Sequence, residues 1–173
     1  MIQVVGARGT IKDIDSFLTQ VRGFSQTFHC VIQVFDATLI YGEEHLVSAV
    51  THALRAMKRK TNTTNSLEME IMLYASGERQ LKLAIPKMGV KQGKGSIAVV
   101  FVHETEKTSG GVSDQTIDTM LHSLSFIRDD SVLMGNMDTL KNFGITDKEF
   151  RTVKKEKYGH LILEKIALVD IIK

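Results

Sequence analysis

Five side chains that could bind an anion recur along one predicted helix. His45, Ser48, His52, Arg55 and Arg59 are separated by three, four, three and four residues, which places them on one face of an α-helix. Imidazole, hydroxyl and guanidinium groups in such a row are suited to phosphate contacts. A solvated amphipathic helix without a ligand would show the same stripe. The spacing alone therefore leaves both interpretations open.

The distribution of charge along the chain favours a polyanionic partner. The chain has 173 residues and a formal net charge of +2. Between residues 55 and 94, nine basic residues are accompanied by three acidic ones, so this segment carries +6 and the remainder −4. Such an asymmetry is typical of a basic patch that binds nucleic acid. A solvated basic surface without a ligand is the alternative.

The motifs that look catalytic or cofactor-binding are incomplete. Residues 93–96, Gly-Lys-Gly-Ser, lack the residues that complete a phosphate-binding loop, and we interpret them as a tight turn. Residues 103–107 begin like the zinc-protease motif HExxH but end in lysine. His45 and His52 would lie about 10.5 Å apart along a helix, too far to share a metal ion. We therefore predict no catalytic residue, no metal and no cofactor.

The composition is that of a globular protein outside the membrane. Hydrophobic residues make up 43% of the chain, and no apolar run approaches the roughly 18 residues that cross a bilayer. The first five residues lack the basic start of a signal peptide. A single cysteine, Cys30, cannot form an internal disulfide and is expected to be a packing residue. We expect one domain over residues 1–173, located in the cytoplasm.

The elements that must position these residues follow from hydrophobic periodicity. Strands are predicted at 2–5, 30–35, 67–74 and 97–102, and helices at 13–25, 42–60, 77–88 and around 117–124. A capping box at residues 146–149 starts a further helix. The chain should therefore have an α+β fold, with a mixed sheet of about four strands flanked by helices and a helical C-terminal half.

Three of these predictions rest on particular residues. The strand at 67–74 is inferred from Leu, Met and Ile residues that alternate with Glu68 and Glu70. Pro86 should kink or shorten the helix at 77–88, which Gly89 should cap. Residues 105–112, with two adjacent glycines, are expected to form a mobile loop.

The C-terminal segment 161–173 is more apolar than a surface helix requires. A surface helix needs only one apolar stripe, whereas this segment has few polar positions. Its apolar side chains are either buried centrally or left for a partner. The pattern does not decide between the two.

Several sequence blocks together carry a resemblance to a known family. The blocks are residues 35–37, 42–46, 52–56, 70–80 and 88–90. Their order resembles the small kinase-binding subunit of the KEOPS tRNA-modification complex, the PRPK-binding protein family, in its archaeal form. The specific match covers about residues 30–105.

The resemblance implies a non-enzymatic, regulatory role. A subunit of this kind binds the small atypical kinase or ATPase of the complex and helps recruit tRNA by its 3′ CCA end for threonylcarbamoyladenosine formation. The carbamoyltransferase would be an indirect partner. Two alternatives are a stand-alone RNA-binding protein and a small enzyme with an unrecognised site.

The resemblance also assigns uses to the two ambiguous surfaces. It implies tRNA contacts at His52, Arg55, Arg59, Lys60, Arg79 and Lys82. It implies kinase contacts at Leu161, Ile162, Ile166, Val169 and Ile172. Tyr74 or an arginine side chain is the expected stacking partner for an unpaired base.

Overall fold

The computed structural model describes residues 1–103 and 111–172. Of Ile172 it describes the backbone but not the side chain. The chain divides into two compact units, which are described separately. The first unit comprises Met1–Ala37 and Val90–Leu133, and the second comprises Thr38–Gly89 and Met134–Lys173. The single domain over residues 1–173 stays a prediction.

The first unit is built on a four-stranded sheet. Its strands are β1 (Ile2–Ile11), β2 (Val31–Asp36), β3 (Gly93–Val102) and β4 (Phe126–Arg128). They lie in the order β2-β3-β1-β4, and all three pairings are antiparallel. The α+β class and the number of strands are confirmed, but the sheet is antiparallel and not mixed.

The pairing of β1 with β3 corrects the interpretation of residues 93–96. The register runs from Ile2 opposite Val102 to Ile11 opposite Gly93, so these glycine-rich residues begin a strand and do not form a tight turn. Glycine has a low intrinsic propensity for β-strands. The partner strand supplies the hydrogen bonds that extend β3 through this segment.

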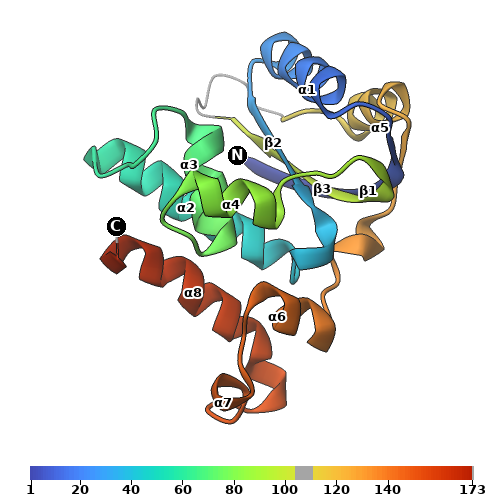
Figure 1. Ribbon diagram of the computed structural model, residues 1–173. Coiled ribbons are helices and arrows are strands. Elements are labelled where there is room, and N and C mark those ends of the chain that lie inside the picture. The colour runs from blue at the N-terminus through green and yellow to red at the C-terminus, as the bar shows by residue number, and fades with distance from the viewer. Residues whose placement is uncertain (104–110, 173) are drawn as a thin grey trace. The chain divides into compact units, whose positions relative to one another are not determined.

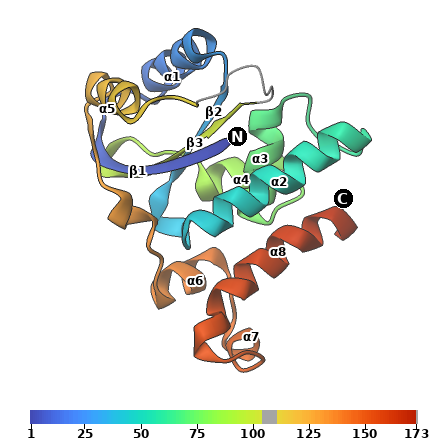
Figure 2. The ribbon, with the colours of Figure 1, turned by 180° about the vertical axis from the view of Figure 1, so that it is seen from behind.

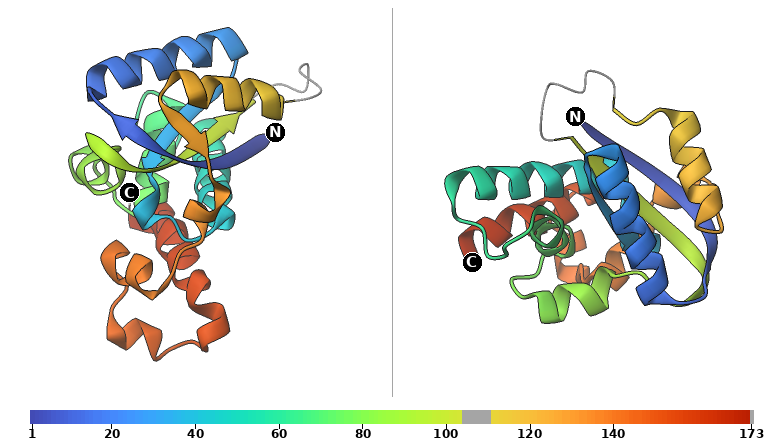
Figure 3. Two further views of the ribbon diagram at one scale, coloured as in Figure 1. Left: turned by 90° about the vertical axis from the view of Figure 1, so that its right-hand side faces the viewer. Right: turned by 90° about the horizontal axis from the view of Figure 1, so that it is seen from above.

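Two helices cover one face of this sheet. Figure 3 shows α1 (Ile14–Phe28), in blue, and α5 (Asp114–Ser123), in gold, over the same face. The core between helices and sheet includes Val5, Ala7, Phe17, Val21, Ile32, Val34, Val99, Phe101, Ile117, Leu121 and Phe126. Cys30 is also buried there, and burial raises its pKa to about 11. It is a packing residue, as predicted.

The second unit is helical. It contains α2 (Glu43–Arg59), α3 (Leu67–Ser76), α4 (Leu81–Met88), α6 (Met137–Phe143), α7 (Asp147–Phe150) and α8 (Tyr158–Ile172). Short 3-10 turns are η1 (Ala37–Leu39), at the boundary of the units, η2 (Asp130–Leu133) in the first unit, and η3 (Lys155–Lys157) before α8. Helices α2, α3 and α8 pack together (Figure 1), and Figure 2 shows α2 and α8 side by side.

The predicted strand at 67–74 is wrong, because this segment forms α3. Ser66 caps the helix by accepting a hydrogen bond from the Met69 amide at 3.3 Å. All residues from Glu70 to Ser76 are buried. A helix that is buried on all sides has no polar face, so its sequence does not show the 3.6-residue period. Glu68 and Glu70 are two residues apart, which is the spacing expected of a strand.

The remaining helix boundaries are partly as predicted. Gly77 ends α3 in the left-handed conformation (φ 67°), so α4 begins only at Leu81. Pro86 lies inside α4, and the Gly89 amide closes the last turn on the Ile85 carbonyl at 2.8 Å.

The capping box at residues 146–149 is confirmed at the start of α7. A second capping box, from Asn136 and Thr139 at the start of α6, was not predicted. Of the loop expected to be mobile, residues 105–110 lie outside the described part of the chain.

Close packing at β1 leads to a test of the sheet. A Cβ atom at Gly9 would lie 2.3 Å from the Ser125 carbonyl oxygen and 2.6 Å from the Phe126 ring. Overpacking of this kind costs about 1–3 kcal/mol, so Gly9→Ala should lower the free energy of urea unfolding by that amount. The cross-strand partner Gly95 has open space around it, and Gly95→Ala should change stability by less than about 1 kcal/mol. Equal effects would contradict the β1–β4 packing.

Candidate functional site

Three helices of the second unit bring one carboxylate against three polar side chains. Asp170, near the end of α8, accepts a hydrogen bond from the Tyr74 hydroxyl on α3. Its Oδ2 atom lies 2.8 Å from His52 Nδ1 and 3.6 Å from Arg55 Nη2, both on α2. The structure therefore brings the predicted tRNA residues His52 and Arg55 together, but against a carboxylate. Asp170 lies at a polar position of an apolar segment, a signal that sequence reasoning left unused.

Burial and hydrogen bonding act in opposite directions on Asp170. Burial raises its pKa, whereas hydrogen bonds from Tyr74 and His52 and the charge of Arg55 lower it, and the net result is a lowered pKa. Burial, and then the hydrogen bond to Asp170, raise the pKa of Tyr74. At neutral pH the carboxylate is therefore ionised and the phenol protonated. The cluster ties the end of α8 to α2 and α3.

Tyr74 cannot be the stacking partner of a nucleotide base. Its side chain is fully buried, and its ring centre lies 5.5 Å from that of His52. That part of the sequence prediction is wrong, because α3 is an interior helix. Stacking on an arginine side chain stays a prediction.

His45 does not belong to the exposed stripe, although its spacing placed it there. It is fully buried, and the Phe143 ring of α6 packs edge-on at 5.5 Å between ring centres. The Tyr41 amide donates to its Nδ1 at 3.2 Å, so Nε2 carries the hydrogen and donates to the Ala75 carbonyl at 2.8 Å. Burial lowers the pKa of His45 to about 4, so the ring is neutral at physiological pH.

The other predicted tRNA residues lie exposed at two helix ends. Arg59 and Lys60 end α2, whereas Arg79 and Lys82 lie at the start of α4. A pocket of about 530 Å³ lies beside Arg79. It is lined by Thr63, Thr64, Asn65, Ser66, Met69, Leu73, Arg79, Gln80 and Leu81. The loop that follows Lys60 therefore forms one wall and Arg79 contributes to another.

Glu70 holds this loop in place. Its buried carboxylate accepts hydrogen bonds from the amides of Thr63 at 3.1 Å and Thr64 at 2.9 Å, and from the Thr64 hydroxyl at 3.0 Å. Hydrogen bonds to a charged, buried group are stronger than those between neutral groups. Sequence reasoning missed this residue because it assigned Glu70 to the polar positions of a predicted strand. Its spacing of six residues from Thr64 offered no recognisable signal.

Most of the predicted kinase contacts are buried in the second unit. Leu161, Ile162, Ile166 and Val169 are all at most 3% exposed. The side chain of Ile172 lies outside the described residues. The four residues lie on the buried side of α8, which packs against α2 and α3, so they can affect a partner only through the position of this helix.

A different face of α8 is open. Glu164, Leu168 and Ile171 are exposed and follow spacings of four and three residues, with Ala167 beside them. Leu168 is 37% and Ile171 77% exposed. We call Glu164, Leu168 and Ile171 the outer stripe of α8. The apolar C-terminal segment therefore has one buried face and one exposed face.

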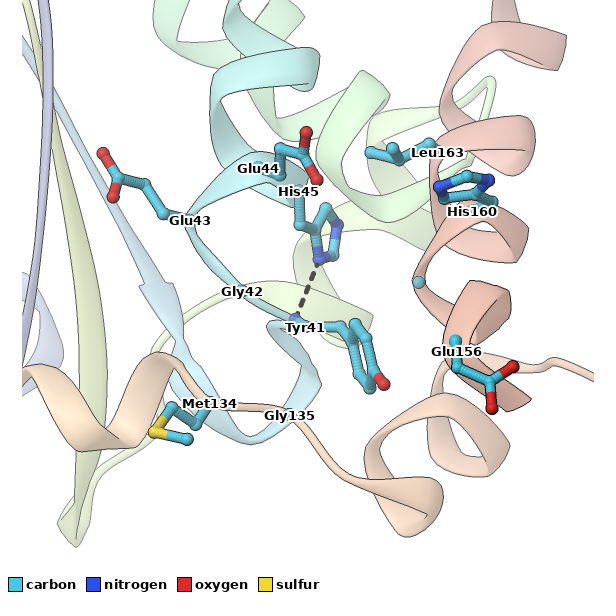
Figure 4. A pocket seen from close by; sticks show the side chains of 11 residues that line it. Tyr41, Gly42, Glu43, Glu44, His45, Met134, Gly135, Glu156, His160 and Leu163 are labelled. Atoms are coloured by element: carbon cyan, nitrogen blue, oxygen red, sulfur yellow. Dashed lines mark hydrogen bonds between the residues drawn. The ribbon is translucent and has the colours of Figure 1, made fainter. Parts of the chain in front are cut away.

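A second pocket, of about 470 Å³, lies at the start of α2 (Figure 4). The Tyr41 ring is packed against Gly135, where a Cβ atom would lie 2.3 Å from the ring. His45 is part of the lining, but both of its ring nitrogens bond to backbone groups. It therefore has no free lone pair for general-base catalysis. The described lining contains no serine, cysteine or lysine that could act as a nucleophile.

The described residues offer neither a metal site nor a membrane-spanning helix. Within residues 1–103 and 111–172, no three His, Cys, Asp or Glu side chains are grouped to hold a metal ion. No helix in the described part of the chain is long and apolar enough to cross a membrane.

The sequence is similar to proteins of one family. A family model described as kinase binding protein CGI-121 matches residues 10–170. A protein of Methanocaldococcus jannaschii named "Regulatory protein Cgi121" is 30% identical over 145 residues, which cover 82% of this chain and 84% of that protein. Both matches extend well beyond the sequence blocks at residues 35–90.

Burial of His45 predicts a specific pH dependence of stability. The pKa of His45 is about 4 in the folded protein and 6.5 in the unfolded chain, so between these values the unfolded state binds more protons. The free energy of unfolding should then fall with decreasing pH, by about 2 kcal/mol between pH 7 and pH 5 from this residue. Urea unfolding at both pH values should show this loss in the wild type.

The loss should be absent from His45→Gln, which is expected to be less stable at pH 7 but less dependent on pH. The exposed His160 offers a matched control, and His160→Gln should keep the wild-type dependence. An unchanged pH dependence in His45→Gln would contradict the buried, neutral state.

Proposed function

Because the chain belongs to the CGI-121 kinase-binding protein family, we propose that it is the non-catalytic regulatory subunit of a KEOPS complex. In this role it binds the small atypical kinase of the complex and helps recruit tRNA, by its 3′ CCA end, for threonylcarbamoyladenosine formation. The match over residues 10–170 carries the proposal, since the family description names kinase binding and the archaeal relative is named a regulatory protein.

The outer stripe of α8 is the proposed kinase contact. Interfaces gain most of their binding energy from a few large side chains that become fully buried. Leu168 and Ile171 are large, apolar and exposed on one helix face, while the buried face of α8 fixes their position. We therefore assign the kinase contact to this stripe and not to the buried residues of α8.

Ile171→Glu should weaken kinase binding about tenfold or more, because it places a charge in the apolar centre of the contact. The measurement is titration calorimetry, or co-elution, with the purified small kinase of the same complex. Ile166→Glu is unsuitable, since Ile166 is fully buried and a charge there would unfold the second unit.

Ile127→Glu is the matched control, because Ile127 is 70% exposed on β4 of the first unit. It should bind the kinase like the wild type. If Ile127→Glu loses kinase binding and Ile171→Glu keeps it, the kinase contact does not lie on the outer stripe of α8. If the wild type itself does not bind the kinase, a stand-alone RNA-binding protein becomes the better interpretation.

The basic ends of α2 and α4 are the proposed tRNA contact. Arg59, Lys60 and Lys82 are exposed cations suited to phosphate groups. The pocket beside Arg79 combines the apolar side chains of Met69, Leu73 and Leu81 with polar residues such as Asn65 and Gln80. Unpaired bases are recognised by such a combination of an arginine plane and hydrogen-bonding groups. His52 and Arg55 support this surface through the Asp170 cluster.

The double variant Arg59→Gln/Lys82→Gln should bind tRNA about tenfold more weakly, with a salt dependence reduced by about one to two phosphate contacts. Gel shifts with intact tRNA and with tRNA lacking its CCA end measure both effects. Removing the CCA end should weaken wild-type binding in the same way.

Lys12→Gln/Arg22→Gln is the control variant, which removes two exposed charges from the first unit. It should leave tRNA binding within about twofold, because no contact is proposed there. Equal binding of the two tRNAs by the wild type would exclude the CCA end as the ligand, and equal effects of the two double variants would exclude this surface.

A further inference from the structure

A second group of exposed cations lies at the other end of α8, outside the basic segment of residues 55–94. Between residues 147 and 157 there are five basic and three acidic residues. The basic ones are all exposed: Lys148, Arg151, Lys154, Lys155 and Lys157. We call these five residues the basic tip. They lie on α7, on η3 and on the segment between them.

The backbone of the basic tip is held by bonds that do not use its cations. The Thr146 amide donates to Glu149 Oε2 at 2.7 Å, and Lys165 on α8 forms an ion pair with the other oxygen of Glu149. The hydrogen bond from Lys165, and then that from Thr146, lower the pKa of Glu149 to about 2. Phe150 is buried and packs edge-on against Tyr158 at 4.9 Å. The tip is therefore a defined surface on α8.

The cations of the tip are not neutralised within the structure. Among the residues described, no carboxylate forms an ion pair with any of the five. Of the three acidic residues in this segment, Glu149 is already paired with Lys165, which leaves Asp147 and Glu156. The tip thus presents an excess of about three positive charges, which favours a polyanionic partner.

The side chains around the tip favour nucleic acid over protein. Protein interfaces have an apolar core, and lysine is depleted in them. The exposed large apolar side chains of the described chain all lie outside residues 138–167. A surface of lysine and arginine without an apolar centre is instead typical of contacts to phosphate groups.

The same surroundings favour a double helix over a single strand. Single-stranded nucleic acid is bound by aromatic side chains on which bases stack. Phe150 is buried, and the ring of Tyr158 packs against it. Contacts from the tip would therefore reach the sugar–phosphate backbone and not the bases.

The position of the tip on α8 relates it to the proposed tRNA surface. Tyr158 and Asp170, at the two ends of α8, are twelve residues apart, or about 18 Å along the helix axis. Asp170 contacts His52 and Arg55, beside the first basic surface. The two basic surfaces therefore lie toward opposite ends of α8, and one short RNA helix with an unpaired end is long enough to span the length of this helix.

We propose that the basic tip is a second RNA-binding surface, which contacts the phosphate backbone of double-helical RNA without reading its sequence. The inference rests on the proposed role in tRNA recruitment, and it assigns tRNA binding to two surfaces of the second unit. The surface at α2 and α4 binds the unpaired end, and the tip binds the adjoining helix.

The test compares two triple variants that each remove three exposed positive charges. The tip variant is Arg151→Gln/Lys154→Gln/Lys157→Gln, and the control variant is Lys12→Gln/Arg22→Gln/Lys141→Gln. The probes are a blunt RNA duplex, intact tRNA and a short single-stranded RNA ending in CCA, each titrated at several salt concentrations. Circular dichroism melting verifies that both variants fold like the wild type.

The tip variant should bind the duplex about tenfold more weakly, with a salt slope reduced by about two to three, since each phosphate contact contributes roughly one unit. Its binding of the single strand should stay unchanged, and the control variant should match the wild type with all three probes. Duplex binding that is the same in both variants would overturn the proposal while leaving the tRNA role intact.

Three other outcomes also overturn it. If the wild type binds none of the RNAs, the tRNA role and the tip proposal fail together. If the tip variant keeps its RNA affinity but loses co-elution with the small kinase, the tip is a protein contact. A reduced affinity for the single strand alone would likewise exclude a duplex as the ligand.

Discussion

Helix α3 is buried along most of its length, and its buried polar groups have to bond inside the second unit. An unpaired polar group in such a position costs free energy comparable to that of a lost hydrogen bond. Four residues of α3 bond to four different neighbours: Glu70 to the loop 61–66, Tyr74 to α8, Ala75 to α2 and Ser76 to α4. The arrangement of the surrounding helices therefore depends on this one interior helix.

The surfaces of the second unit follow from these bonds. Because α8 is attached to α2 and α3 through Asp170 and through its buried apolar face, its outer stripe is left on the outside. Because Glu70 holds the loop after α2, the pocket beside Arg79 has a defined wall. The ion pair of Glu149 with Lys165 fixes the basic tip in the same manner. These polar bonds thus help to position one apolar and two basic surfaces of the second unit.

The extent to which each helix is buried explains which elements could be predicted from the sequence. The helix at 42–60 was predicted almost to the residue, because acidic residues begin it, basic residues end it, and one face is apolar. The segment 67–74 was assigned the wrong type, because burial on all sides removes the periodicity on which such a prediction rests. His45 kept the spacing of an exposed stripe but lies in the first turn of α2, where α3 and α6 cover it.

Local sequence patterns are enough to predict the α+β class, the position of most helices, the capping box at Thr146 and, through the order of the sequence blocks, the family. These signals are carried by residues that are neighbours along the chain or recur at a fixed period. Three features are seen only in the folded chain: β1 pairs with the glycine-rich start of β3, the buried Glu70 holds the loop after α2, and Asp170 contacts His52. Each of these depends on groups that are distant or irregularly spaced in sequence, and the free energy that selects them comes from burial, which no local pattern contains.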